Sequence, residues 1–260
     1  PTRNMEYAYY SLGFGDEPLD RNDAMSRKDW SKWHDAEKTE VQALFDRGTF
    51  VYVPREKVPP GKKVIKCKWV YKRKPDRYKA RLVVKGFMQS PFDYGETFAP
   101  VCTLSTVRML LSMTANKSNW SLRQLDISTA FINAILSEEV YMEPPEGYQD
   151  EHPGQVCLLK KALYGLKQAP KEWYDTLTTW LQSDEDGPKL KQSPHDPCLL
   201  SQKIGDKEMW IALYVDDLLM TGDQELIDTF MEKISNKYVI RDLGVPETFL
   251  GMEITRDLSK

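Results

Sequence analysis

The chain has 260 residues, of which 41% are hydrophobic and 29% charged, as in ordinary globular proteins and unlike disordered or fibrous chains. No apolar stretch is long enough to cross a bilayer, and the amino terminus lacks the apolar core of a signal peptide. The cysteines form no Cys-x-x-Cys pair and the three histidines are scattered, which argues against a zinc site and a disulfide framework: Cys67, Cys102, Cys157 and Cys198. Four reduced thiols indicate an intracellular protein.

The net charge of −3 hides a strongly basic block. Residues 62–85 contain eleven lysines and arginines and a single acidic residue, Asp76. A basic block within an otherwise acidic chain indicates a local contact with a polyanion.

Residues 1–20 show no periodicity and are expected to form a loosely ordered leader. A helical pattern begins at Asp23 and ends at Gly48. Its large apolar residues fall close to one face, and simple packing explains them best: Trp30, Trp33, Val41, Leu44 and Phe45.

The basic block alternates with a period of two, which predicts a strand with one apolar and one largely basic face. The apolar positions are Ile65, Cys67, Trp69 and Tyr71, and the alternating ones are Lys66, Lys68, Val70 and Lys72. Pro75 and Asp76 supply a turn, and residues 78–85 return as a second strand. The prediction is a hairpin covered with cations. A solvated hairpin face is the alternative.

Thr103 or Ser105 is expected to cap a helix that continues through Leu110 and Met113. Residues 121–126 predict a strand, residues 169–182 and 224–238 predict helices, and residues 183–197 predict a polar loop.

Two adjacent carboxylates, Asp216 and Asp217, lie inside an otherwise apolar run. The flanking residues 211–215 and 218–220 predict two short buried strands with the carboxylates at the turn between them. Because a buried ionised carboxylate is costly, such a pair favours a bound cation. An exposed pair without a ligand is the alternative that the pattern leaves open.

Asp126 is the other carboxylate that ends an apolar strand pattern. If its strand pairs with the Asp216-Asp217 hairpin in one sheet, the three carboxylates could hold two divalent ions about 3.5–4 Å apart, as in-line phosphoryl transfer requires. Magnesium is the natural ion because it prefers hard oxygen ligands and substrate phosphates.

Both carboxylate sites belong to a series of segments, among them Gln124-Leu-Asp-Ile-Ser-Thr-Ala-Phe-Ile-Asn133 and Leu213-Tyr-Val-Asp-Asp-Leu-Leu219. The others are residues 68–72, 78–89, 93–101, 139–142, 145–148, 163–170, 173–174, 242–244 and 249–254. In this order they resemble the reverse transcriptase domain of copia-type (Pseudoviridae) LTR retrotransposon Pol polyproteins, over roughly residues 20–256.

The resemblance implies an α+β fold, a right-hand polymerase with fingers and palm. The palm would be an antiparallel sheet with helices packed on one face, and the thumb would be largely absent. Residues 21–120 would be mainly fingers, with the N-terminal helix and the basic hairpin. Residues 121–260 would be mainly palm, with 160–200 partly fingers, ending at the primer grip.

The resemblance also implies the roles of individual residues. Asp126, Asp216 and Asp217 match the catalytic, metal-binding triad, with the first two as principal ligands. Phe131 matches the aromatic gate that rejects a ribose 2′-hydroxyl, although from sequence alone a plain core phenylalanine is the better interpretation. The other residues expected to bind dNTP are Tyr164, Gly165, Lys167, Lys79, Arg81 and Lys85. Those expected at the primer or template are Tyr214, Val215, Leu250, Gly251 and Met252.

The implied activity is RNA-directed DNA synthesis from a primer 3′-hydroxyl with two Mg²⁺ ions, for which Mn²⁺ could substitute. The implied partners are an RNA or DNA template with primer, dNTPs and, in the full polyprotein, ribonuclease H, integrase, protease and Gag. Location in a cytoplasmic virus-like particle with a nuclear phase, and no membrane contact, are expected. The alternatives are an RNA-dependent RNA polymerase, which Phe131 disfavours, and a catalytically impaired nucleic-acid-binding remnant.

Overall fold

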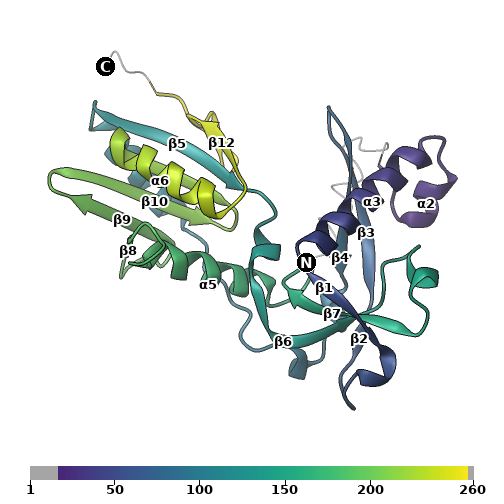
Figure 1. Cartoon of the computed structure of the whole chain (residues 1–260). Helices are drawn as coiled ribbons and strands as arrows, with labels where there is room; N and C mark the ends of the chain where they lie inside the picture. Colours follow the sequence, from purple (N-terminus) through teal and green to yellow (C-terminus); the bar gives the residue numbers. More distant parts are fainter. Residues whose placement is uncertain (1–16, 257–260) are drawn as a thin grey trace. The chain divides into compact units, whose positions relative to one another are not determined.

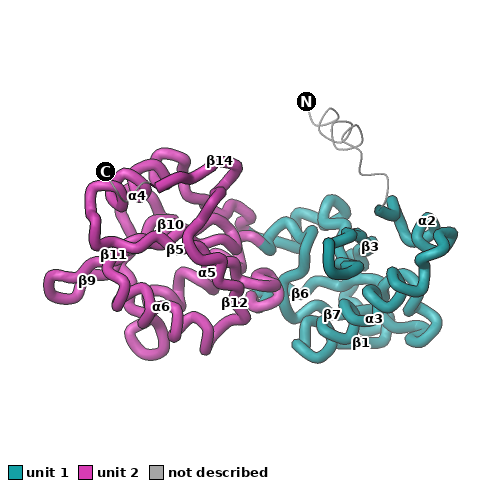
Figure 2. Tube along the Cα trace, turned by 90° about the horizontal axis from the view of Figure 1, so that it is seen from above, with its two compact units in different colours: residues 1–95, 135–169 teal, residues 96–134, 170–260 magenta. Residues whose placement is uncertain are grey.

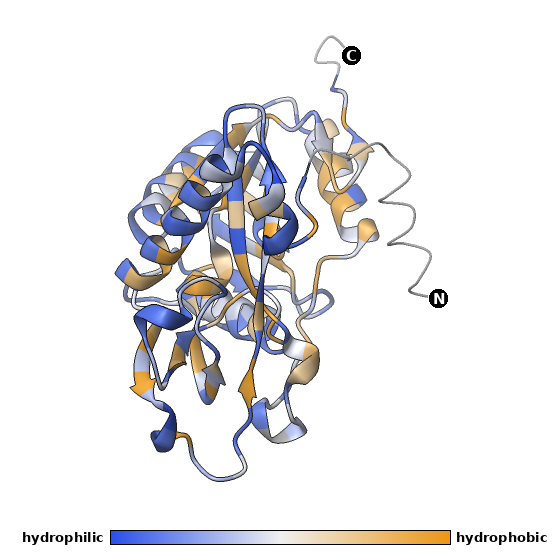
Figure 3. Ribbon diagram, turned by 90° about the vertical axis from the view of Figure 1, so that its right-hand side faces the viewer, coloured by the Kyte–Doolittle hydropathy of each residue, from blue (hydrophilic) through white to orange (hydrophobic). Residues whose placement is uncertain are grey.

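The computed structural model describes residues 17–256 (for Phe92, the backbone only), so most of the expected leader lies outside the described residues. The chain divides into two compact units. Unit 1 contains residues 1–95 and 135–169, and unit 2 contains residues 96–134 and 170–260 (Figure 2). Hydrophilic and hydrophobic residues alternate along the strands and helices, as expected for elements with one buried side (Figure 3).

The described part of unit 1 begins with two helices, α2 (Arg21–Ser26) and α3 (Trp30–Asp46) (Figure 1). The prediction of one uninterrupted helix from Asp23 is therefore wrong. Asp20 caps α2 by accepting a hydrogen bond from the Asp23 backbone N–H at 2.9 Å, and Arg27 is extended at φ −86°, which ends the first helix.

Within its described residues, unit 1 also contains two sheets. The four-stranded sheet has the order β1-β7-β6-β2. Its members are β1 (Phe50–Pro54), β7 (Gln155–Lys161), β6 (Ile135–Met142) and β2 (Val64–Ile65). The β2–β6 pair is parallel and the other pairs are antiparallel.

The second sheet is the predicted basic hairpin, β3 (Cys67–Arg73) and β4 (Tyr78–Val84), and it is confirmed. Cys67, Trp69 and Tyr71 are buried, while the alternating residues are exposed. Trp33 of α3 packs edge-on against Tyr71 with ring centroids 5.4 Å apart, so α3 covers the apolar face of the hairpin. The basic face is left uncovered by α3.

A buried charge joins α3 to this hairpin. Glu37 is completely buried, accepts a hydrogen bond from the Tyr71 hydroxyl and forms a 3.3 Å ion pair with Arg21 of α2. Burial raises the pKa of Tyr71 above its ordinary value, so the hydroxyl stays protonated and donates. Removing either partner would leave the buried Glu37 carboxylate only partly compensated.

Unit 2 is built on one antiparallel sheet of six strands in the order β12-β5-β11-β10-β9-β8. They are β12 (Ile240–Gly244), β5 (Trp120–Ile127), β11 (Asp217–Asp223), β10 (Lys207–Tyr214), β9 (Leu199–Ile204) and β8 (Lys191–Gln192). A two-stranded hairpin, β13 (Thr248–Phe249) and β14 (Met252–Glu253), follows.

Three longer helices belong mainly to this unit: α4 (Leu104–Ala115), α5 (Ala169–Gln182) and α6 (Gln224–Lys237). The helix predicted from residues 169–182 is confirmed at both ends. Thr103 is the cap of α4, because its side chain accepts a hydrogen bond from the Thr106 backbone N–H at 3.1 Å.

The expectation that the helices pack on one face of the sheet is wrong. Thr221 of β11 hydrogen-bonds through its hydroxyl to Thr114 of α4 at 2.6 Å. Arg123 of β5 instead forms an ion pair with Asp228 of α6 at 3.3 Å. Because Thr221 lies opposite Leu122, the neighbour of Arg123, these contacts are on opposite faces (Figure 2). Helices on both faces explain why the interior of β11 is continuously apolar and buried.

No helix within residues 17–256 has both the length and the apolar character needed to cross a membrane.

Candidate active site

The Asp216-Asp217 pair lies at the turn of the β10–β11 hairpin, as predicted. The strands are in register from Met209 opposite Gly222 to Tyr214 opposite Asp217, which leaves Val215 and Asp216 as the turn. Val215 has φ +59°, a conformation that a β-branched residue rarely adopts. Such strain persists where surrounding contacts hold it in place.

Trp173 of α5 supplies one of these contacts. Its indole Nε1–H donates a 2.8 Å hydrogen bond to the Val215 carbonyl oxygen, and its side chain is fully buried. The ring packs edge-on against Tyr238 with centroids 5.5 Å apart. A buried tryptophan thus fixes the backbone at the turn that carries the two carboxylates. Sequence reasoning gave Trp173 no role, because the contact spans 42 residues of chain.

The predicted pairing of the Asp126 strand with this hairpin is confirmed. Strand β5 lies next to β11 with Asp126 directly opposite Asp217. Beyond the end of the ladder, the Ile127 backbone N–H donates to the Asp216 carbonyl oxygen at 2.8 Å. Because directly opposed residues project from the same face of a sheet, the side chains of Asp126 and Asp217 are neighbours.

Two further side chains contact these carboxylates, and sequence reasoning missed both. Gln124 Nε2 donates to Asp217 Oδ1 at 3.3 Å. Arg241 of β12 is opposite Asp126, with its guanidinium 3.8 Å from Asp126 Oδ1. Gln124 lies two residues before Asp126 on one strand, so the period of two could have indicated it. Arg241 carries no such signal, since its strand joins β5 from a distant part of the chain.

The surrounding charges and hydrogen bonds shift the pKa of Asp217. Burial raises the pKa of Asp217 above its ordinary value, and the adjacent Asp126 carboxylate raises it further. The hydrogen bond from Gln124 and the positive charge of Arg241 lower it. Two carboxylates this close repel each other, and a cation between them would relieve the repulsion.

The donor set fits a divalent cation through two carboxylates. Asp126 and Asp217 offer the hard oxygen donors that magnesium prefers. Within residues 17–256, no group of three or more histidine, cysteine, aspartate or glutamate side chains lies close enough together to hold a metal ion. The structure therefore brings Asp126 and Asp217 together as a pair and places Asp216 beside them along the chain.

Phe131 follows β5 in the short 3₁₀ helix Ala130–Asn133 and is half-buried, unlike a core phenylalanine. Thr129, just before this helix, adopts a left-handed φ of +56° and redirects the chain after Ile127. The Ser128 backbone N–H donates to the Val239 carbonyl oxygen at 2.8 Å, which ties this turn to β12. Phe131 thus lies in unit 2, a short turn beyond Asp126.

The residues expected to bind dNTP phosphates lie in unit 1. Arg81, on the basic face of β4, is stacked over the Tyr164 ring with its guanidinium carbon 5.0 Å from the centroid. Partial burial and the Arg81 charge lower the pKa of the Lys79 ammonium, while the nearby Glu40 carboxylate raises it. Lys85 follows β4, where its backbone N–H donates to the Lys66 carbonyl oxygen at 2.8 Å. Crowded cations of this kind favour an anionic ligand.

Gly165 has a structural reason to be glycine. Its φ is +94°, and a Cβ atom there would lie 2.0 Å from the Val84 carbonyl oxygen of β4. The close backbone approach predicted for Gly165 is thus made to β4 in this structure. Next to it, Lys167 Nζ donates to the Tyr94 hydroxyl at 2.9 Å.

Three expected primer or template residues lie at the β13–β14 hairpin. Leu250 and Gly251 form its turn with φ of +50° and +77°, and Met252 begins β14. Such a two-residue turn with two positive φ angles is typical of a tight hairpin. The other two expected residues, Tyr214 and Val215, belong to the β10–β11 hairpin described above.

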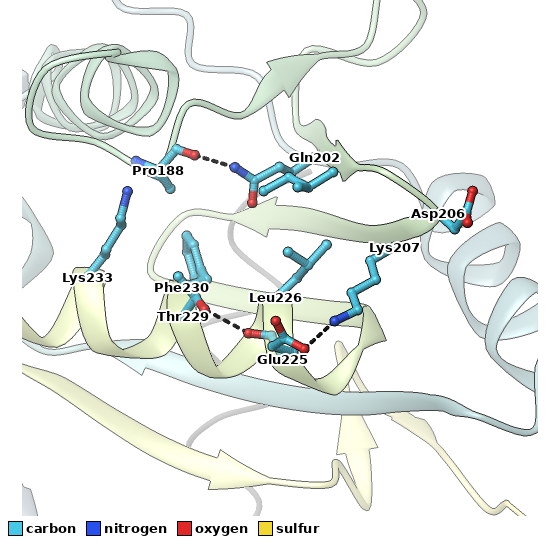
Figure 4. A pocket seen from close by; sticks show the side chains of 10 residues that line it. Pro188, Gln202, Asp206, Lys207, Glu225, Leu226, Thr229, Phe230 and Lys233 are labelled. Carbon is cyan, nitrogen blue, oxygen red and sulfur yellow. Dashed lines mark hydrogen bonds and ion pairs between the residues drawn. The ribbon is translucent and has the colours of Figure 1, made fainter.

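The cavity shown in Figure 4 is separate from these carboxylates. It has a volume of about 450 Å³ and is lined mainly by α6 and the β9–β10 hairpin, including Leu226, Phe230 and the Lys207–Glu225 ion pair. Since α6 covers the face opposite to Asp126 and Asp217, the cavity contributes nothing to their chemistry.

Comparison with known proteins confirms the family that the sequence motifs resemble. A family model described as reverse transcriptase (RNA-dependent DNA polymerase) matches residues 51–259. The chain is 38% identical over 253 residues to the retrovirus-related Pol polyprotein from transposon TNT 1-94 of Nicotiana tabacum, a match that covers 93% of this chain and 18% of that protein. It is 36% identical over 263 residues to the corresponding polyprotein from transposon RE2 of Arabidopsis thaliana, covering 97% of this chain and 17% of that protein.

The chain thus spans less than a fifth of the length of these two relatives. Among solved structures, one of the foamy viral protease-reverse transcriptase dRH in complex with double-stranded DNA matches with a TM-score of 0.47 at 12% identity. That match covers 86% of this chain and 34% of the other.

Proposed function

Because this chain belongs to the reverse transcriptase (RNA-dependent DNA polymerase) family, with copia-type retrotransposon Pol polyproteins among its relatives, we propose that it catalyses RNA-directed DNA synthesis. The reaction joins the 3′-hydroxyl of a primer to the α-phosphate of a dNTP and releases pyrophosphate. It is a phosphoryl transfer, for which catalysis consists mainly of positioning and electrostatic stabilisation.

One observation supports this proposal most strongly. Asp126 and the Asp216-Asp217 turn, 90 residues apart in the chain, come together on adjacent strands with Asp126 opposite Asp217. The turn is held in a strained conformation by a buried hydrogen bond from Trp173. A fold-stabilising site would not place two repelling carboxylates side by side on a half-buried surface.

In the proposed site, Asp126, Asp216 and Asp217 hold divalent cations, with Mg²⁺ as the natural ion and Mn²⁺ as a substitute. When bound, these ions would lower the pKa of the attacking hydroxyl and stabilise the leaving pyrophosphate. Gln124 orients the Asp217 carboxylate through its hydrogen bond to Oδ1. Trp173 holds the backbone of the turn, so the two carboxylates keep their position without a backbone rearrangement.

We assign Phe131 to the selection of the sugar. It is half-buried in the turn after β5, within five residues of Asp126, so part of its ring remains available to a ligand. We assign Lys79, Arg81 and Lys85 to the triphosphate, supported by the uncovered basic face of the β3–β4 hairpin. Tyr164, Gly165 and Lys167 complete this group, and residues 250–252 with Tyr214 and Val215 are assigned to the primer or template.

Primer extension on poly(rA)/oligo(dT) tests the proposal. The chain is expected to incorporate dTTP with Mg²⁺ present and not with EDTA, and to discriminate against UTP. Phe131→Ala should reduce that discrimination while retaining dTTP incorporation. Metal-independent incorporation would contradict the proposed chemistry, and equal use of UTP by the unaltered chain would favour an RNA polymerase. Salt-sensitive binding of an RNA–DNA hybrid without any extension would favour the nucleic-acid-binding alternative.

A further inference from the structure

A cation of the protein itself lies beside the proposed metal ligands. Arg241 is on β12, the strand that flanks β5 on the side away from β11. Asp126 is opposite Arg241 on one side and opposite Asp217 on the other, so the three residues form one row across three strands. Cross-strand partners share a face of the sheet. The guanidinium of Arg241 therefore meets Asp126 on the surface where a divalent ion would bind.

The contact between Arg241 and Asp126 is loose. The guanidinium nitrogen is 3.8 Å from Asp126 Oδ1, which is within ion-pair range and beyond hydrogen-bond distance. The Arg241 side chain is 69% exposed, whereas that of Asp126 is 25% exposed. Exposed pairs of this kind contribute little free energy and are readily broken. The arginine can thus swing into solvent without disturbing β12.

The electrostatic effect of Arg241 extends along the row. Its positive charge lies on the far side of Asp126 from the Asp217 carboxylate, in the same cross-strand row. Arg241 therefore neutralises part of the negative charge that the two carboxylates create. A divalent cation bound by Asp126 would provide the same neutralisation more strongly, and it would repel the guanidinium a few ångströms away.

We propose that Arg241 is a displaceable counter-cation of the active site, which competes with the divalent metal ion for Asp126. In the metal-free protein Arg241 pairs with Asp126, and metal binding releases it. The inference rests on the proposed function, because it takes Asp126 to be a metal ligand. Its consequence is that the protein binds its metal more weakly than its carboxylates alone would allow.

Direct titration of Mn²⁺, with the free ion measured by electron paramagnetic resonance at a pH near 8 and without nucleic acid, tests this inference. Arg241→Gln is expected to bind Mn²⁺ about threefold to tenfold more tightly than the unaltered chain. Arg241→Lys keeps the charge and should stay close to the unaltered chain. Because Arg241 is exposed, neither variant endangers the fold, and circular dichroism checks this.

The same substitution in an Asp126→Asn background separates the possible outcomes. Without the Asp126 carboxylate, Arg241→Gln should change Mn²⁺ affinity much less than in the unaltered chain. Unchanged or weaker Mn²⁺ binding by Arg241→Gln, or equal tightening in both backgrounds, would overturn the competition. If Asp126→Asn alone leaves Mn²⁺ binding intact, Asp126 is no metal ligand, and the proposed function fails together with the inference.

Discussion

Replacing Trp173 with phenylalanine tests how the turn that carries Asp216 and Asp217 is held. The substitution removes the 2.8 Å hydrogen bond to the Val215 carbonyl oxygen and shortens a fully buried ring. The unpaired carbonyl and the residual cavity together are expected to cost about 2–4 kcal/mol in the free energy of unfolding. The strain at Val215, with φ +59°, is of the order of 1–3 kcal/mol, so the turn should relax once this restraint is lost.

A relaxed turn displaces the Asp216 and Asp217 carboxylates, and we expect kcat for dTTP incorporation to fall about tenfold to 100-fold. Trp180→Phe is the matched control. Trp180 lies on the same helix, packs edge-on against the same Tyr238 and donates to the Asp186 carbonyl oxygen at 3.1 Å. Its loss should cost similar stability and leave kcat near the value of the unaltered chain.

Val215→Gly makes the role of strain measurable. Glycine adopts a positive φ without steric cost, so the turn then needs no restraint from Trp173. In this background, Trp173→Phe should lower kcat by less than about threefold, while its stability cost remains. An equal loss of kcat in both backgrounds would refute the reasoning, since Trp173 would then act through general stability alone.

Two further predictions concern individual contacts. Gly165→Ala should destabilise the protein by about 3 kcal/mol or more, because its Cβ would meet the Val84 carbonyl oxygen. Gly154 is the control: its φ is +73° and no atom lies within 4 Å of an added Cβ, so Gly154→Ala should cost only about 1–2 kcal/mol. Equal losses of stability in urea unfolding would contradict this difference. The hydrogen bond from Arg123 lowers the pKa of Asp242. The ionised Asp242 carboxylate therefore stabilises the folded protein above the ordinary carboxyl pKa, and this stabilisation is lost as the pH falls through the lowered pKa. Asp242→Asn should therefore be less stable by under about 1 kcal/mol at pH 7 and equal at acidic pH, and a difference that persists in acid would exclude this linkage.

Local patterns predicted much of the fold. The alternation in residues 65–72 predicted the exposed and buried faces of β3, and the apolar flanks of Asp216 predicted the β10–β11 hairpin. These elements could be predicted because their signals are short-range: strand periodicity, turn residues and helix caps. The helix that begins near Asp23 was predicted too long, because the capping by Asp20 and the extended Arg27 depend on contacts that periodicity does not report.

Contacts between segments that are distant in the chain could not be predicted from the local sequence pattern. Which face of the sheet each helix covers depends on side-chain packing, so the single helical face expected from the resemblance was wrong. The sequence predicts that Asp126 meets the Asp216-Asp217 pair only if their strands are neighbours in one sheet. No local pattern indicates that Arg241 of β12 lies beside Asp126. Family resemblance predicts the roles of the carboxylates, which stay predictions, and the structure adds the contacts of Trp173 with the turn and of Arg241 with Asp126.

The most direct test of the central claim is Mg²⁺-dependent incorporation of dTTP on poly(rA)/oligo(dT) by Asp126→Asn, compared with the unaltered chain and with Asp206→Asn. Asp206 is exposed in the β9–β10 turn and serves as the control for loss of a carboxylate. We expect Asp126→Asn to lower the rate by more than about 100-fold with its circular dichroism unchanged, and Asp206→Asn to leave the rate intact. Extension by folded Asp126→Asn at the rate of the unaltered chain would contradict the assignment of these carboxylates to catalysis.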